Sequence, residues 1–420
     1  MRDARNGRLR VDPALVRGLT QPRFSRRDFL RYAGVGAGMG VLAACGVGGS
    51  NKTKQSPASS ADLAKIYGDG KPAGHLDFAN WPDYIDVNAK GDSPTLQAFT
   101  EATGIDVTYR TAVNDNNPFL AKIIPSLQNG QDTGYDLIVI TNGGPVERMI
   151  KLGFLTPLDH DFLPNFARFA SPAVKDPTYD PGNRYTVAWQ SGFTAIGYNS
   201  KYIDTAPTTF GDLLDPKYKG KVGMFGNNQD LPCPALAFMG FDIQTSTPDQ
   251  WKKTADMLMR HRDRGQFRGF YDQSYLNELE NGNILITQAW SGDIFIAAAA
   301  KSLGGDGYPE MKESFPEEGA VLWTDNQCIP LHAKHPVDAI TFMDFAYKPR
   351  IAAELADFIW FVSPVPAAKD QLEHSDPDVA NSPLVFPSLE VQAKAHKYRV
   401  FRDSDEEEEW NSAWEPVFSS

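Results

Sequence analysis

The hydrophobic and polar positions of the first folded region change between two periods along the chain. Short apolar runs, which predict strands, are followed by stretches with apolar residues three or four positions apart, which predict helices. The expected strands are residues 76–79, 105–109 and 135–140, and the expected helices are 94–103, 119–127 and 146–152. The run at 135–140 is almost continuously apolar, as in parallel strands that are buried on both faces. This alternation predicts an α/β fold with a doubly wound sheet.

A second α/β unit is predicted over about residues 191–290. Its strands are expected within 186–198 and at 221–225 and 284–290, and an amphipathic helix is expected at 250–262. A further strand at 321–330 and helices at 337–345 and 351–359 follow. With 420 residues, the chain is long enough for two domains, each with its own core.

The amino-terminal region carries two export signals in series. The segment Ser25-Arg26-Arg27-Asp28-Phe29-Leu30-Arg31 has a twin-arginine pattern, and a small-residue, mildly apolar run leads from it to Leu42-Ala43-Ala44-Cys45. This order resembles that of exported bacterial lipoproteins. The resemblance implies a signal peptide at 1–44 that is recognised through Arg26 and Arg27, and a lipid on Cys45 that anchors the protein to the outer face of the cytoplasmic membrane. A transmembrane helix is disfavoured because the run is short and rich in glycine.

The segments at the two ends of the mature chain are polar. Residues 45–73 are expected to be the lipid anchor and a flexible linker, since 46–60 are mostly Gly, Ser, Asn, Lys and Ala, and ordered structure is expected from about His75. Residues 401–420 contain a run of acids and are expected to be a solvated acidic tail.

The charge balance limits the class of ligand. The net charge is −12, and loss of residues 1–44, with nine Arg and three Asp, would bring it to −18. Such an acidic chain argues against a nucleic acid partner and is compatible with a cationic ligand. Cys233 and Cys328 are expected to be buried free thiols, although the compartment permits a disulfide. No Cys and His spacing indicates a zinc site.

Aromatic and acidic residues recur together near the ends of the expected strands. They are found in Asn80-Trp81-Pro82-Asp83-Tyr84, Asn227-Asn228-Gln229-Asp230 downstream of Phe225, Trp290-Ser291-Gly292-Asp293 and Trp323-Thr324-Asp325, and more loosely in Tyr271-Asp272-Gln273-Ser274-Tyr275. Each pair alone could be a core aromatic beside a surface acid, and Pro82 alone would favour a surface turn. Four such pairs instead indicate a ligand site beyond the strand ends.

An aromatic face next to a carboxylate suits an alkylammonium group. Ring faces attract the cation and cover its methylenes, and a buried ammonium needs charged hydrogen-bond partners. These stretches contain no Lys or Arg, which disfavours an anionic ligand such as phosphate. The pattern therefore favours a linear di- or polyamine.

At this point the chain resembles a known family, the periplasmic spermidine/putrescine-binding proteins of bacterial ABC importers. The resemblance covers nearly all of residues 74–400. Its markers are the Asn80–Tyr84 and Trp290–Asp293 motifs together with Tyr135-Asp136-Leu137-Ile138-Val139, Thr194-Ala195-Ile196-Gly197-Tyr198-Asn199 and Asp215-Pro216-Lys217-Tyr218-Lys219-Gly220.

The resemblance implies a two-lobed α/β fold of the type II periplasmic binding proteins, with the ligand in the cleft between lobes. The expected lobes are 74–190 plus 291–333 and 191–290 plus 334–400. The protein would be a monomer without cofactor, metal or catalytic activity that captures a polyamine and delivers it to an ABC permease.

The site residues that this resemblance implies come from both lobes. They are Trp81, Asp83, Tyr84, Thr141, Asp230, Trp290, Asp293, Trp323 and Asp325, and Tyr271 is added from the looser stretch. Gly143 and Gly144 stand where some members carry an aromatic or polar side chain, and Asn227 stands where spermidine-preferring members have an acid. The remaining acids are closer to the putrescine-preferring pattern.

Three alternatives stay open from the sequence. A receptor of the same fold could take another cation or iron, for which tyrosines such as Tyr84, Tyr271 and Tyr275 are available, but iron would leave the tryptophans unexplained. An exported enzyme would fit twin-arginine export, although no haem, iron–sulfur, nucleotide or nucleophile–base motif is found. A binding protein that signals instead of supplying a transporter would have the same sequence features.

Overall fold

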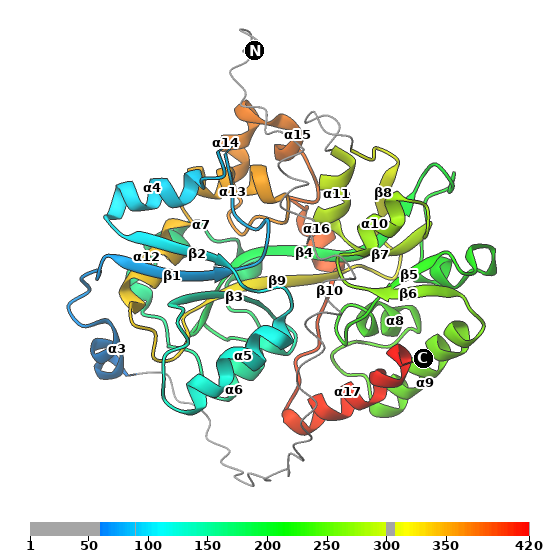
Figure 1. The fold of residues 1–420 in the computed structure, drawn as a ribbon, viewed down its shortest axis with the longest axis horizontal. Helices are drawn as coiled ribbons and strands as arrows, with labels where there is room; N and C mark the ends of the chain where they lie inside the picture. Colours follow the sequence, from blue (N-terminus) through cyan, green and yellow to red (C-terminus); the bar gives the residue numbers. More distant parts are fainter. Residues whose placement is uncertain (1–58, 89, 300–306, 420) are drawn as a thin grey trace, which may run out of the picture.

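The structure, a computed structural model, describes residues 59–88, 90–299 and 307–419. Their strands form one ten-stranded sheet in the order β2-β1-β3-β9-β4-β7-β5-β6, with β10 beside β9 and β8 beside β4 (Figure 1). The strands are β1 (His75–Asn80), β2 (Asp106–Thr111), β3 (Leu137–Thr141), β4 (Thr186–Asn199), β5 (Val222–Phe225), β6 (Phe267–Tyr271), β7 (Ile286–Trp290), β8 (Met311–Ser314), β9 (Val321–Cys328) and β10 (His396–Lys397).

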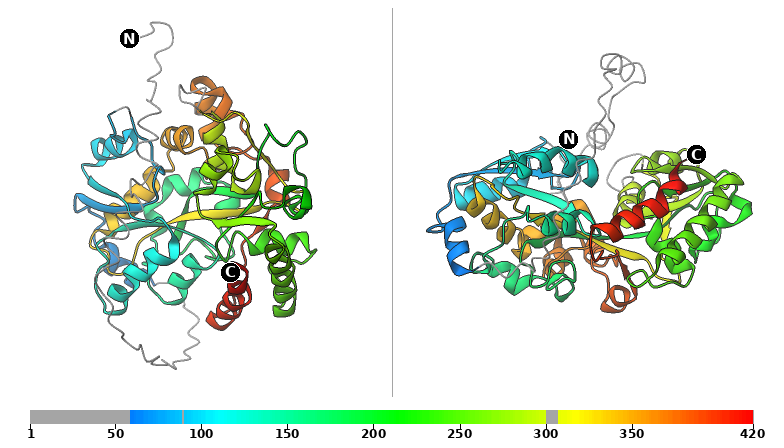
Figure 2. Two further views of the ribbon diagram at one scale, coloured as in Figure 1. Left: turned by 45° about the vertical axis from the view of Figure 1, so that its right-hand side comes forward. Right: turned by 90° about the horizontal axis from the view of Figure 1, so that it is seen from below.

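Helices pack around the two ends of this sheet. They are α3 (Ser60–Tyr67), α4 (Pro94–Thr103), α5 (Asn116–Gln128), α6 (Pro145–Lys151), α7 (Pro164–Phe169), α8 (Pro232–Phe238), α9 (Pro248–Asp263), α10 (Tyr275–Glu280), α11 (Ser291–Ala299), α12 (Pro336–Phe345), α13 (Pro349–Ile359), α14 (Ala368–Ser375), α15 (Pro377–Ala380), α16 (Leu389–Lys394) and α17 (Ser404–Phe418). Many begin with proline at the first helical position, where no backbone N–H is needed. Figure 2 shows separate groups of helices at the two ends.

Two long strands join the two ends into one sheet. Strands β1, β2 and β3 pair in parallel at one end, and β5, β6 and β7 pair in parallel at the other. Between them, β9 runs antiparallel to both β3 and β4, and β4 runs antiparallel to β7. Every residue of β4 and β9 is buried. We call the β1–β3 end the first unit and the β5–β7 end the second unit.

The lobe boundaries differ from those expected after residue 290. Helix α12 contacts β1, and α13 contacts α4, so both belong to the first unit and not to the second. Asp338 of α12 accepts hydrogen bonds from the backbone N–H groups of Ala73, Gly74 and His75 at 2.7–3.0 Å. Conversely, α11 packs on β8, β4 and β7 of the second unit. The reason is that β9 leads the chain back beside β3, so the helices after it emerge at the first unit.

Ordered structure begins before the expected linker ends. Residues 45–73 were expected to be anchor and linker, but α3 forms within them, with Ser59 and Asp62 making a capping box. Tyr67 is 3% exposed, stacks on Phe162 with ring centroids 5.5 Å apart, and donates to the carbonyl of Pro157 at 3.0 Å. Leu63, Ile66 and Tyr67 give α3 an apolar stripe that the surrounding polar residues hid.

The expected solvated tail is a packed helix. Trp410 and Trp414 in α17 are 1% and 0% exposed, and Trp410 lies edge-on to Trp251 of α9 at 5.2 Å. Asp403 caps the helix, and acids in its first turn complement the positive end of the helix dipole. The acidic run therefore belongs to a packed amphipathic helix, in which Glu406 is buried against Arg399 and the other acids are at least partly exposed.

The remaining expectations concern the cysteines, the export signals and membrane-spanning helices. Cys233 and Cys328 are buried and free, as predicted. Arg26, Arg27 and Cys45 lie outside the described residues. Within the described ranges, no helix combines the length and apolar character needed to cross a bilayer.

Candidate functional site

Asp325 collects two hydroxyl donors from the first unit. It lies in β9 and is 5% exposed. Tyr84, in the loop after β1, donates to Oδ2 of Asp325 at 2.7 Å, and Thr141, at the end of β3, donates to Oδ1 at 2.6 Å. Because the ends of β1 and β3 are adjacent, two of the expected site residues, Tyr84 and Thr141, contact a third, Asp325.

Asp293 has a comparable but looser environment in the second unit. It lies in the first turn of α11, directly after β7, and is 6% exposed. Tyr275 donates to Oδ2 at 3.1 Å, and the Gln273 amide lies 3.3 and 3.5 Å from the two oxygens. Trp290 stacks on Phe225 with centroids 4.7 Å apart. Trp290 is half-buried and remains partly accessible to a ligand.

Asp230 differs from these two because its oxygens have more donors. It precedes α8 and is 5% exposed. Oδ1 accepts from Thr194 at 2.5 Å and from the hydroxyl of Tyr398, and Oδ2 accepts from the Asn227 amide at 3.0 Å. Three donors from three segments therefore hold this carboxylate.

The carboxylates form an electrostatically connected group. Burial raises the pKa of both Asp293 and Asp325 from 3.8 to about 6, and the charge of Asp83 adds to the rise at Asp293 while that of Asp230 adds to the rise at Asp325. Burial also raises the pKa of Asp230. None of these four acids forms an ion pair with Lys or Arg of the described ranges. Three of them, Asp230, Asp293 and Asp325, are buried, and buried carboxylates of this kind are stabilised by a cation that binds among them.

The loop after β1 is held rigidly. Asn80 is fully buried, accepts from the Trp81 backbone N–H at 2.9 Å and donates to the Tyr84 carbonyl at 3.2 Å. The indole N–H of Trp81 donates to the Val139 carbonyl at 3.2 Å. Asp83 is exposed and has φ 54°, a left-handed conformation that costs free energy in a non-glycine residue. Pro82 and Asp83 form an exposed turn, as the surface-turn alternative predicts, and the buried support involves Asn80, Trp81 and Tyr84 on either side of it.

Two expected residues take other positions. Trp323 is 6% exposed and packs over Gly192, where a Cβ would lie 2.4 Å from its ring, and against Phe361 at 5.3 Å. The ring of Tyr271 lies close to Gly269, and its electrostatic neighbours are Glu278 and Arg268. The structure brings Tyr275, and not Tyr271, to Asp293.

Two aromatic residues were missed from the sequence. The ring of Phe361 lies 2.7 Å from the position of a Cβ on either Gly192 or Gly292, and 5.8 Å from the ring of Tyr84. Tyr398 contacts Asp230 from the segment after β10. Gly192 and Gly292 could have indicated this contact, because a glycine next to a site motif leaves room for an aromatic ring from another segment.

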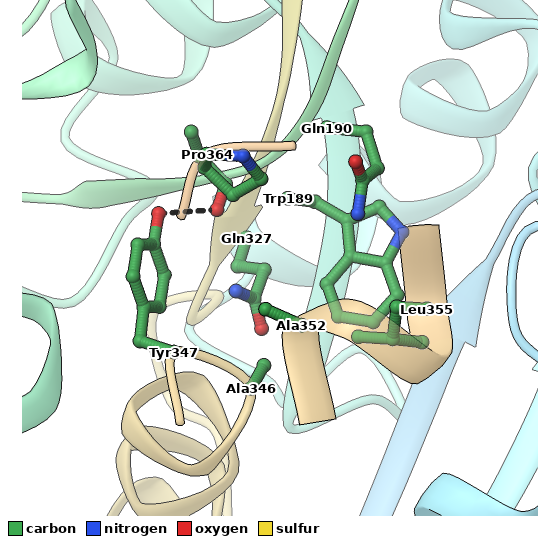
Figure 3. Close-up of a pocket in the computed structure, with 9 residues that line it drawn as sticks. Trp189, Gln190, Gln327, Ala346, Tyr347, Ala352, Leu355 and Pro364 are labelled. Carbon is green, nitrogen blue, oxygen red and sulfur yellow. Dashed lines mark hydrogen bonds between the residues drawn. The ribbon is translucent and has the colours of Figure 1, made fainter. Parts of the chain in front are cut away.

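A small cavity lies next to the crossing strands, and none of these acids is among its lining residues. Figure 3 shows residues of β4, β9 and α13 around it. Its volume is about 10 Å³. Gln190 and Gln327 line it, and Tyr347 donates to the carbonyl of Ala188 at 2.6 Å. This volume is about that of one water-sized probe, so the cavity cannot hold an alkylamine. No group of three or more His, Cys, Asp or Glu residues in the described part of the chain is arranged to hold a metal ion.

Comparison with known proteins gives one family. The model of the bacterial extracellular solute-binding proteins matches residues 95–387. The putrescine-binding periplasmic protein SpuD of Pseudomonas aeruginosa is 30% identical over 337 residues, which cover 77% of this chain and 86% of the relative. The spermidine/putrescine-binding periplasmic protein of Escherichia coli is 29% identical over 329 residues, covering 77% and 87%.

A solved structure shows the same fold. The substrate-binding protein PotD of a spermidine/putrescine ABC transporter from Streptococcus pneumoniae superposes with a TM-score of 0.68, at 24% identity, over 82% of this chain and 98% of the other. This confirms the expected α/β fold of type II periplasmic binding proteins. Since the relatives are periplasmic proteins, this one acts outside the cytoplasm. The chain belongs to the bacterial extracellular solute-binding proteins.

Proposed function

We propose that this protein binds a linear polyamine, putrescine or spermidine, and delivers it to the permease of an ABC transporter without chemical conversion. The observation that carries the proposal is the group of buried carboxylates, without a Lys or Arg partner in the described ranges, beside Trp290 and Tyr84. Ammonium groups would supply the missing charge, and the aromatic rings would cover the methylenes. The names of the relatives support the same ligand class.

Capture would use both units. Asp83, Tyr84, Thr141 and Asp325 lie at the first unit, and Trp290 and Asp293 lie at the second. A ligand that contacts both sides favours the closed arrangement, because only that arrangement completes its contacts. Strands β4 and β9 are the connections across which such closure would bend.

The attachment of the protein is a separate part of the proposal. Cys45 would carry a lipid after cleavage of residues 1–44, and Arg26 and Arg27 would direct export of the folded chain. The protein would act as a monomer on the outer face of the cytoplasmic membrane. Mass spectrometry of the membrane-extracted protein tests this: a diacylglyceryl group on Cys45 is expected, and an unmodified amino terminus upstream of it would contradict the anchor.

Calorimetry tests the ligand. The purified protein is titrated with putrescine, cadaverine, spermidine and spermine, with sulfate as an anionic control. At least one amine is expected to bind and sulfate is not. Trp290→Ala and Asp293→Asn are each expected to weaken amine binding by about tenfold or more, through loss of a ring face or of a charge partner. Unchanged affinity in both variants would overturn the site assignment, and turnover of an amine on incubation would show an enzyme instead.

A further inference from the structure

The segment between β10 and α17 passes beside the site and is fixed there by its backbone. The Gln244 side chain, from the second unit, donates to the carbonyls of Lys397 and Tyr398 at 3.1 and 2.8 Å and accepts from the N–H of Val400 at 3.1 Å. Arg399 is 6% exposed and donates to the Ile243 carbonyl at 2.7 Å. The second unit therefore holds the backbone of Tyr398 itself and the residues before and after it.

The side chain of Tyr398 fills the space above Gly143. A Cβ on Gly143 would lie 2.6–2.8 Å from the Cβ and ring atoms of Tyr398. Gly143 also has φ +83°, which disfavours any side chain there. Tyr398 is 4% exposed and places its hydroxyl on Asp230. An aromatic group thus reaches the position beyond Thr141, but it comes from the distant segment after β10.

The three buried acids differ in the number of side chains that donate to them, three at Asp230 and two each at Asp325 and Asp293. Asp230 accepts from Thr194, Tyr398 and Asn227. Asp325 accepts from two hydroxyls, and Asp293 accepts one hydroxyl bond and two long contacts from one amide. A carboxylate has about four acceptor positions. Asp293 and Asp325 therefore keep acceptor positions for an ammonium, and Asp230 is nearly saturated by the protein.

We propose that Tyr398 is a specificity-determining residue that closes the site at Asp230, so that the site takes a diamine with two terminal ammonium groups and rejects longer polyamines. This inference rests on the proposed polyamine-binding function. Asp293 and Asp325 are the two ammonium partners. A third ammonium would have to displace the Tyr398 hydroxyl from Asp230 and move a ring whose backbone is tied to Gln244 and Ile243.

The test measures the affinity ratio of putrescine to spermidine by calorimetry. In the unmodified protein the ratio is expected to favour putrescine by about tenfold or more, since an unpaired ammonium costs more than one hydrogen bond. Tyr398→Ala opens the space and frees an acceptor of Asp230, so it is expected to shift the ratio toward spermidine by about tenfold. Tyr398→Phe keeps the ring and is expected to keep the preference for putrescine.

Controls separate this inference from the proposed function. Tyr202, a tyrosine of the second unit that is 51% exposed, is changed to Ala as the matched control and should leave the ratio unchanged. If Tyr398→Ala does not fold, Tyr398→Leu replaces it because it keeps more buried apolar area. A protein that binds no amine would overturn the proposed function. An unmodified protein that prefers spermidine, or a Tyr398→Ala variant with an unchanged putrescine-to-spermidine affinity ratio, would overturn this inference alone.

Discussion

The hydroxyl of Tyr84 donates to Asp325 at 2.7 Å and joins the loop after β1 to a strand that crosses between the two units. This bond favours the ionised form of Asp325, whose pKa burial has raised to about 6. Asp325 is thus kept able to pair with an ammonium while it is almost fully buried.

Removing this donor is expected to weaken amine binding. Tyr84→Phe keeps the ring but removes a hydrogen bond that favours the ionised form of Asp325, so the pKa of this acid should rise further and the dissociation constant at about pH 6 should increase by up to about tenfold. Calorimetry with the preferred amine measures this. Tyr67→Phe, which removes only a bond to the Pro157 carbonyl in the first unit, is the matched control and should leave affinity unchanged. Equal affinity in the two variants would contradict a role for Tyr84.

Lowering the pH should stabilise the free protein and weaken its binding of the amine. Asp293 and Asp325 have folded pKa values of about 6 against 3.8 ordinarily, so the free folded state holds more protons than the unfolded state between these values. Their contribution to stability is present at low pH and is lost as pH rises through about 6. An ammonium needs both acids ionised, so amine affinity should fall below about pH 6, by up to about tenfold per pH unit for each acid.

Thermal unfolding at about pH 7.5 and pH 5, with and without the amine, measures both effects. The stabilisation by the amine should be smaller at the lower pH. Asp293→Asn is the control, because it removes one of the two titrating groups and should make the pH dependence shallower. A ligand-induced shift that is the same at both pH values would show that these carboxylates are not the ammonium partners.

The contact between α6 and α17 is expected to affect ligand release. Arg148 of the first unit pairs with Glu407 of α17 at 2.5 Å, and Lys151 donates to the Phe401 carbonyl at 2.8 Å. Both side chains of the ion pair are partly exposed, so the effect should be modest, at most about 1 kcal/mol. Arg148→Ala should raise the dissociation rate by up to about fivefold in stopped-flow measurements, and the exposed Glu408→Ala should not. A slower release from Arg148→Ala would contradict this role.

The packing of α17 is expected to be essential for stability. Trp414 is fully buried, and Trp414→Ala should lower the free energy of unfolding by about 3–5 kcal/mol. Denaturant unfolding followed by circular dichroism measures this loss. The neighbouring Glu415 is exposed, and Glu415→Ala should change stability by no more than about 0.5 kcal/mol. A similar small effect from both substitutions would mean that α17 is not part of the core.

The sequence predicts local structure well where the signals lie within one segment. Ser93 and Pro94 begin α4 and Gly104 ends it, as expected, because capping and left-handed glycine act within a few residues. The sequence also predicts, to within a residue, the strand ends at Asn80, Thr141 and Trp290, since each follows an apolar run. These local signals identified most of the residues around Asp293 and Asp325.

Contacts between distant segments could not be predicted in the same way. Tyr398 reaches Asp230 across 168 residues, and no pattern near either residue indicates the pair. The burial of α17 was missed because its acids are consecutive, whereas its apolar residues Trp410, Trp414 and Val417 form a stripe only when wound into a helix. The return of α12 to the first unit depends on the pairing of β9 with β3, which is a tertiary property.

Helices α3 and α17 lie on different units, and this gives a way to observe closure directly. Helix α3 is held to the first unit through α12 and Tyr67, and α17 is held to the second through α9. Lys65 and Glu415 are exposed on these helices. A donor and an acceptor fluorophore attached there would report the separation of the two units by energy transfer, so single molecules could be followed as they capture and release the amine.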